Sequence, residues 1–156
     1  MSVLTRSIIA CALILAVAGC ATTVENTGKI DPAIASYVEA KDIKWVPNAA
    51  GTAESAVLYG DPSKPGLYIV RNKWKAGNMS RPHFHPNDRL IVVLSGTWWV
   101  GTGDVFDPAS TVPMRAGTQV THYAKKIHYD GAKDEDTFIQ IHGMGPATST
   151  PAERKP

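Results

Sequence analysis

Short apolar runs, rather than long helical patterns, dominate the chain after residue 40. They are rich in β-branched and aromatic residues, are about 4–8 residues long, and are mostly separated by Gly or Pro. The runs lie at residues 43–46, 55–59, 67–74, 89–94, 97–101, 118–123 and 137–143. No segment in this region keeps the 3.6-residue period of an amphipathic helix. The pattern therefore predicts an all-β sandwich or barrel.

The segments on either side of this region differ from it in composition. Residues 20–40 have the composition of a tether, with one short helix predicted after Asp31-Pro32, because Asp is a common N-cap and Pro fits the first turn. Residues 147–156, ATSTPAERKP, are small, polar and Pro-containing, and we predict a disordered tail there. The predicted folded domain is 41–146.

The N-terminus has the pattern of a secretion signal. Arg6 precedes an apolar run of about 12 residues, which is too short for an ordinary membrane-spanning helix and typical of a signal peptide. The run ends in Val17-Ala18-Gly19-Cys20, which resembles the lipobox of bacterial lipoproteins. The resemblance implies a signal peptide over 1–19 and lipidation of Cys20. Ala21, where Asp would favour the inner membrane, favours a periplasm-facing outer-membrane protein.

Charge and cysteine content limit the partners and metal ligands that this chain can have. The formal net charge is only +2, and no Lys/Arg cluster forms a basic patch, so we expect no nucleic-acid partner. The two cysteines are Cys11, inside the predicted signal, and Cys20. A lipidated mature chain would then contain no free thiol, and any metal must be bound by histidines and carboxylates.

His83 and His85 form the first candidate site. Residues i and i+2 of a strand project to the same face, so both imidazoles point the same way if this stretch is extended. Two neutral imidazoles on one face can chelate one Zn, Fe, Mn, Ni or Cu ion.

The spacing around these histidines resembles the first motif of the cupin superfamily. Gly77 is followed after five residues by His83-x-His85, after three more by Arg89, and after six more by Gly96. The family motif has a glutamate where Arg89 stands.

A second stretch resembles the second cupin motif in spacing. Gly117 is followed after five residues by Tyr123, then by Lys125 and His128. The family usually has Pro and Gly at the positions of Tyr123 and Lys125, and Asn at that of Ala132. Together the motifs cover about residues 65–143.

The resemblance implies a double-stranded β-helix, a small jelly-roll barrel. It also implies that His83, His85 and His128 converge inside the barrel and hold a divalent transition metal with an open coordination position, where substrate, O2 or water can bind.

Arg89 leaves three interpretations open, because a guanidinium stays protonated and has no lone pair for a metal. In the first interpretation, which we favour, the Arg89 side chain points away from the histidines and leaves a three-histidine metal site. In the second, it points inward and binds an anionic substrate. In the third, the metal site is lost and the pocket only binds a ligand.

Several other residues are candidates for the site. Tyr123 is a candidate general acid because of its phenol group. Gln140 and His142 share a face that could line the pocket, or could lie opposite the core residues Ile139 and Ile141. Trp98 is a further pocket candidate, while His122 is expected at a strand or rim position rather than as a ligand.

These features predict an envelope-anchored, metal-dependent enzyme of the oxygenase, isomerase or lyase type. Its substrate would be a small organic compound that could be anionic. The alternative is a binding or sensing protein without catalysis, since one fold supports both. A third expectation is a homodimer formed through exposed strand edges.

Overall fold

The computed structural model describes residues 28–154, so the predicted signal peptide and Cys20 lie outside the described residues. Residues 28–36 belong to one compact unit and residues 37–154 to another. In the first unit, Asp31 Oδ1 accepts from the Ala33 N–H (2.9 Å), and Asp31 O accepts from the Ile34 N–H (3.0 Å). The predicted helix is therefore not formed, and residues 32–34 make only a hydrogen-bonded turn. Within residues 28–154, no helix is both long enough and apolar enough to span a bilayer.

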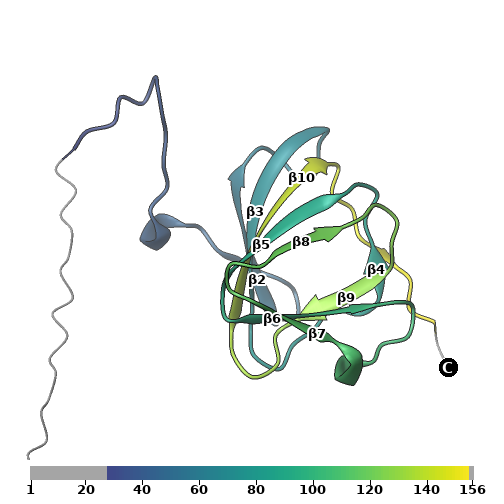
Figure 1. Ribbon diagram of the computed structural model, residues 1–156. Helices are drawn as coiled ribbons and strands as arrows, with labels where there is room; N and C mark the ends of the chain where they lie inside the picture. Colours follow the sequence, from purple (N-terminus) through teal and green to yellow (C-terminus); the bar gives the residue numbers. More distant parts are fainter. Residues whose placement is uncertain (1–27, 155–156) are drawn as a thin grey trace, which may run out of the picture. The chain divides into compact units, whose positions relative to one another are not determined.

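The second unit is built from two antiparallel sheets, which confirms the predicted all-β fold (Figure 1). The six-stranded sheet contains, in spatial order, β1 (Val46–Pro47), β2 (Ala53–Tyr59), β3 (Gly66–Trp74), β10 (Thr137–Gly145), β5 (Arg89–Ser95) and β8 (Gln119–His122). The five-stranded sheet contains β11 (Thr150–Pro151), β4 (His83–Phe84), β9 (His128–Gly131), β6 (Thr97–Thr102) and β7 (Val112–Arg115). Two short 3-10 segments are η1 (Ala40–Asp42) and η2 (Pro108–Ser110).

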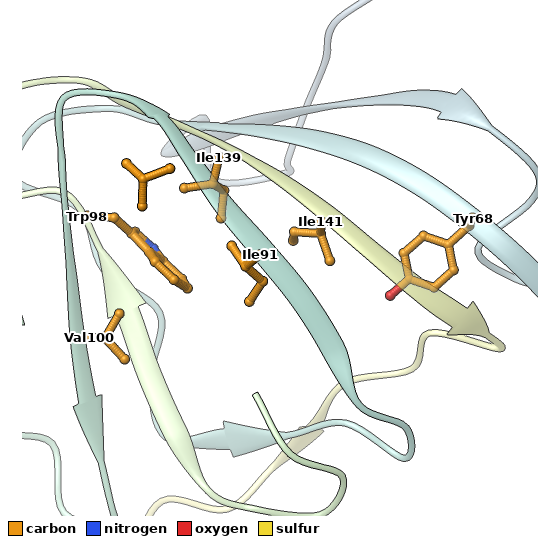
Figure 2. Packing of buried hydrophobic residues seen from close by; sticks show 7 residues of the cluster. Tyr68, Ile91, Trp98, Val100, Ile139 and Ile141 are labelled. Atoms are coloured by element: carbon orange, nitrogen blue, oxygen red, sulfur yellow. The ribbon is translucent and has the colours of Figure 1, made fainter. Parts of the chain in front are cut away.

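The core lies between the two sheets. In β10 buried positions alternate with partly exposed ones, so Ile139 and Ile141 face inward. They pack with Tyr68 of β3, Ile91 of β5 and Trp98 of β6 (Figure 2). Strand parity thus directs β-branched and aromatic side chains from both sheets to one interior.

Gly96 makes the turn between β5 and β6. Its φ is +72°, a conformation that glycine adopts readily, and a Cβ there would lie 2.4 Å from the carbonyl oxygen of Asp136. This glycine closes the first sequence motif, so the structure supplies a steric reason for that position.

The prediction of a disordered tail is wrong for residues 147–154. Strand β11 pairs with β4, which places Pro151 opposite His83. The Ala152 N–H donates to Pro82 O (2.9 Å) and the Arg154 N–H donates to Asp104 O (2.8 Å). These are backbone hydrogen bonds, which depend little on side-chain polarity, so the polar composition did not reveal them. The folded domain therefore extends beyond 146.

Candidate metal centre

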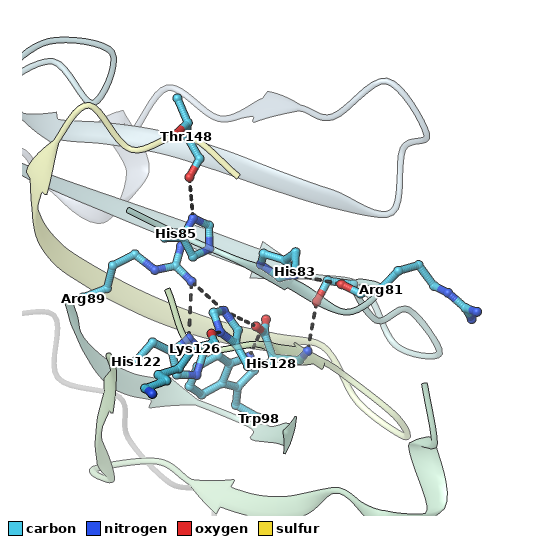
Figure 3. A network of polar contacts seen from close by, with 11 residues as sticks. Arg81, His83, His85, Arg89, Trp98, His122, Lys126, His128 and Thr148 are labelled. Carbon is cyan, nitrogen blue, oxygen red and sulfur yellow. Dashed lines mark hydrogen bonds and ion pairs between the residues drawn. The ribbon is translucent and has the colours of Figure 1, made fainter. Parts of the chain in front are cut away.

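The three predicted ligands lie together between the sheets (Figure 3). His83 of β4 pairs with His128 of β9, and His85 directly follows β4. The His83 ring centroid is 4.9 Å from that of His85 and 4.6 Å from that of His128. One ligand nitrogen from each of the three residues lies within 4.8 Å of the others, so the group could hold a metal ion.

Backbone carbonyls fix the same tautomer in all three rings. The Nδ1 of His83 contacts Arg81 O (2.8 Å), that of His85 contacts Thr148 O (2.8 Å) and that of His128 contacts Lys126 O (3.0 Å). A carbonyl oxygen only accepts, so each Nδ1 carries a proton that it donates. In the neutral ring Nε2 then keeps its lone pair, which is the form that binds metal.

Burial keeps two of these rings neutral. Desolvation lowers the pKa of His85 to about 3, and the nearby Arg89 charge lowers it further. Burial also lowers the pKa of His128, although the Asp130 carboxylate opposes that shift. His85 Nε2 is buried and has no hydrogen-bond partner among residues 28–154. A buried lone pair without a partner is unfavourable by itself and fits a metal ligand.

Arg89 points into this cluster, so the interpretation that it swings away is wrong. Its Nη2 lies 3.3 Å from His122 Nδ1 and 3.4 Å from His128 Nε2 (Figure 3). Burial lowers its pKa, and the Asp130 carboxylate acts in the opposite direction. The guanidinium therefore lies beside the histidines as a buried cation, and it contacts one of the lone pairs that a metal would use.

His122 is the last residue of β8, which fits the strand position expected for it, and it also lies beside the site. It is buried and pairs in register with Arg89 across β5 and β8. Its ring centroid lies 3.8 Å from that of His128. Because Arg89 can only donate, His122 Nδ1 accepts, and the neutral ring carries its proton on Nε2. His122 thus orients Arg89 rather than presenting Nδ1 to a metal.

Asp130 is a further site residue that the sequence analysis did not select. It lies two residues after His128 on β9, is buried, and its Oδ2 is 4.0 Å from His128 Nε2. His122, His128 and Asp130 form a second group that could hold a metal. The i, i+2 relation to His128 was the signal that could have identified it.

Trp98 is both a core residue and a wall of the site. It is fully buried, its ring lies 5.3 Å from His122, and its Nε1–H donates to Asp130 Oδ1 (3.3 Å). For the adjacent Trp99, the ring centroid lies 3.8 Å from Lys133 Nζ.

The histidines open onto a cavity of about 390 Å³. It is lined by His83, His85, Arg89, Trp98, Asp130, Ile139, Ile141, Asn72, Trp74, Ser80, Arg81, Pro82, Ser149 and Pro151.

The other predicted site residues lie elsewhere. Gln140 and His142 alternate with buried Ile139 and Ile141, so they face away from the core. Gln140 accepts from Arg71 Nε (2.8 Å) and contacts His142 Nε2 (2.8 Å). Of the two alternatives for these residues, the structure thus has the outward face opposite the core and not the lining of this cavity.

Tyr123 is 64% exposed and does not line the cavity, so its predicted role as a general acid is not supported either. Lys125, next to it in the turn before β9, has a φ of +61°, and its N–H donates to His85 O (2.7 Å). A lysine thus adopts the left-handed conformation at the position where the second motif usually has glycine.

The fold is the double-stranded β-helix of the cupin type. The two antiparallel sheets form a double-stranded β-helix, with three histidines gathered between them. This fold was predicted from the two motifs and is confirmed.

Solved structures share the fold at low sequence identity. An RmlC-like cupin from Ralstonia eutropha has 20% identity and a TM-score of 0.57 over 70% of this chain and 68% of that chain. The polyketide cyclase RemF from Streptomyces resistomycificus has 15% identity and a TM-score of 0.64 over 78% and 87%. The DMSP lyase DddQ from Ruegeria pomeroyi has 15% identity and a TM-score of 0.56 over 72% and 64%. No protein-family model and no curated protein matches the sequence. At these identities the likeness establishes the fold.

Proposed function

We propose that this chain is a lipid-anchored cupin of the cell envelope, in which His83, His85 and His128 bind a divalent transition metal. We further propose that it is an enzyme of the lyase, isomerase or oxygenase type acting on a small organic acid. The observation that carries the proposal is the shared tautomer, because three backbone carbonyls hold three Nδ1–H groups and leave three Nε2 lone pairs for one ion. Three imidazoles suit Fe, Mn, Zn, Ni or Cu.

The surroundings favour an anionic substrate. Arg89 is a buried cation beside the histidines, and a guanidinium matches the geometry of a carboxylate. Trp98, Ile139 and Ile141 supply apolar wall to a cavity of about 390 Å³, a size that suits a small organic molecule. When bound, a metal would supply Lewis-acid chemistry or a site for O2. Two of the solved neighbours, a lyase and a cyclase, are enzymes by name.

Metal analysis tests the site directly. The full-length protein, solubilised in detergent and purified without chelators, should carry about one transition metal ion per chain, and the His85→Ala variant should carry none. The matched control is His142→Ala, which removes a histidine from the outward face and should retain the metal. Elemental analysis measures both. Unsubstituted protein that is metal-free and takes up none of Fe, Mn, Zn, Ni or Cu would rule out the metal enzyme.

One observation favours a second candidate function, a binding protein without metal. Arg89 Nη2 lies 3.4 Å from His128 Nε2 and could donate to that lone pair in place of a metal. In this case the cavity binds a small anion through Arg89 alone. Anion binding by protein that takes up no metal would favour this function.

The envelope anchor is a separate part of the proposal and is supported by the lipobox-like sequence ending in Cys20. Bacteria expressing the chain and fed an alkyne-labelled fatty acid should label it, and Cys20→Ser should abolish the label. The control, Cys11→Ser, changes the other cysteine and should remain labelled. Persistent labelling of the C20S variant would refute the assignment.

A further inference from the structure

We propose that the ligand of the cavity is a carboxylic acid with a second, uncharged oxygen, such as an oxo or hydroxy acid, and that the Trp74 indole N–H donates to that oxygen. This inference rests on the proposed function, because it takes the carboxylate of the ligand to lie at Arg89. It adds a ligand-binding residue from β3, which precedes the first sequence motif.

Trp74 presents a hydrogen-bond donor that the protein itself does not satisfy. It is the last residue of β3, packs against the core cluster that contains Trp98 and Ile139, and lines the cavity of about 390 Å³. Its Nε1 is buried and has no hydrogen-bond partner among residues 28–154. The Trp98 Nε1–H, by contrast, donates to Asp130. Because a buried N–H without an acceptor is unfavourable, a ligand oxygen at this wall would gain a hydrogen bond.

Arg89 is a second donor in the same cavity. Its Nη2 contacts His122 and His128, whereas its Nε–H is buried and also has no partner within the described part of the chain. A guanidinium is charged and matches a carboxylate, while an indole N–H is neutral and donates equally to a carbonyl or hydroxyl oxygen. The carboxylate of the ligand therefore belongs at Arg89 and the other oxygen at Trp74.

The two donors enter the cavity from separate positions along one strand. Trp74 pairs with Thr137 and Arg89 pairs with Gly143, and both of these partners belong to β10, which lies between β3 and β5 (Figure 1). Six residues of a strand span about 20 Å. A ligand that reaches both side chains therefore carries its two oxygen groups at different points of its carbon chain.

The charges around the cavity favour an uncharged second oxygen. Asp130 lines the same cavity, and its carboxylate would repel a second carboxylate on the ligand. Arg81 also lines the cavity, but its Nε donates to Glu153 Oε2 (2.9 Å), and its guanidinium carbon lies 3.9 Å from the Phe106 ring centroid. Arg81 is thus already paired, which leaves Arg89 as the cation for one carboxylate.

Binding of matched acids tests the inference. The probes are levulinate with valerate, which share a carbon chain and differ only in the ketone oxygen, and the two next longer homologues of each. Ligand-observed NMR titrations of the full-length protein in detergent give the affinities, with detergent alone as the blank. At least one oxo acid should bind roughly 5–10-fold more tightly than its parent acid, the usual gain from one hydrogen bond.

Two variants attribute this preference to the indole N–H. Trp74→Phe should remove it while keeping the affinity for the parent acid. The matched control, Trp99→Phe, changes a tryptophan that does not line the cavity and should keep the preference. If W74F is unfolded by circular dichroism, the assigned Trp74 indole N–H resonance of the unsubstituted protein gives the second readout, and it should move downfield with the oxo acid but not with the parent acid.

Several results would overturn the inference, and they differ from failure of the proposed function. Equal affinity within every pair of acids, or an equal loss for both acids in W74F, would exclude the hydrogen bond from Trp74. Acids that bind Arg89→Met as tightly as the unsubstituted protein, or bind neither, would refute the carboxylate site at Arg89. A metal-free protein that still prefers the oxo acid would refute the metal enzyme alone.

Discussion

Replacing Arg89 with glutamate should strengthen metal binding by at least about 100-fold. The change removes a buried cation and adds an oxygen ligand beside His128. A unit charge about 6 Å from a dication interacts with it by roughly 5 kcal/mol at an effective dielectric constant near 20. Relief of part of this repulsion, about 3 kcal/mol, corresponds to the expected change in affinity. Chelator competition measures the dissociation constants of both proteins.

The matched control for this prediction is R89M, which removes the charge without adding a ligand. It should strengthen metal binding less than R89E does. Equal affinity in all three proteins would mean that position 89 does not contact the metal environment. A gain in R89M as large as that in R89E would attribute the effect to charge alone.

Deleting residues 147–156 should weaken metal binding by about 10–100-fold, the usual effect of removing a group that orients a metal ligand. The deletion removes Thr148 O, which accepts from His85 Nδ1 (2.8 Å), and so frees the ring to rotate or change tautomer. It also removes β11, which pairs with β4 at His83. Chelator competition gives the affinity, and thermal unfolding should show a lower midpoint for a protein that still folds.

A shorter deletion provides the control for this effect. Removing only residues 155–156 leaves the Arg154 N–H bond to Asp104 O and everything before it. This protein should bind metal as the full chain does. A folded protein lacking 147–156 with full metal affinity would show that the tail does not position His85.

Local patterns predicted the long strands well. The apolar runs at 67–74, 89–94 and 137–143 correspond to β3, β5 and β10 within one or two residues. These strands carry β-branched and aromatic side chains on a core-facing side, which is the signal that periodicity detects. Strands β4 and β11 are two residues each, and their pairing joins segments more than 60 positions apart. No local pattern identifies such pairs.

The sequence predicted the three converging histidines, because family spacing carries long-range information. It did not predict His122 as a neighbour of Arg89, which depends on the register between β5 and β8. It missed Asp130, although the spacing from His128 matches that between His83 and His85. The direction of Arg89 was predicted wrongly because burial of a cation is unfavourable in general, and only the nearby Asp130 carboxylate and His122 make it acceptable here.

Lys125 has a left-handed backbone conformation at a position where the second motif usually has glycine. A residue with a Cβ in the left-handed conformation is strained by roughly 1 kcal/mol compared with glycine, yet the turn stays in place because the Lys125 N–H holds His85 O. A sequence motif that requires glycine does not match at this position, although Lys125 has the positive φ that glycine favours. Distant relatives of this chain should therefore be easier to recognise by superposition than by alignment.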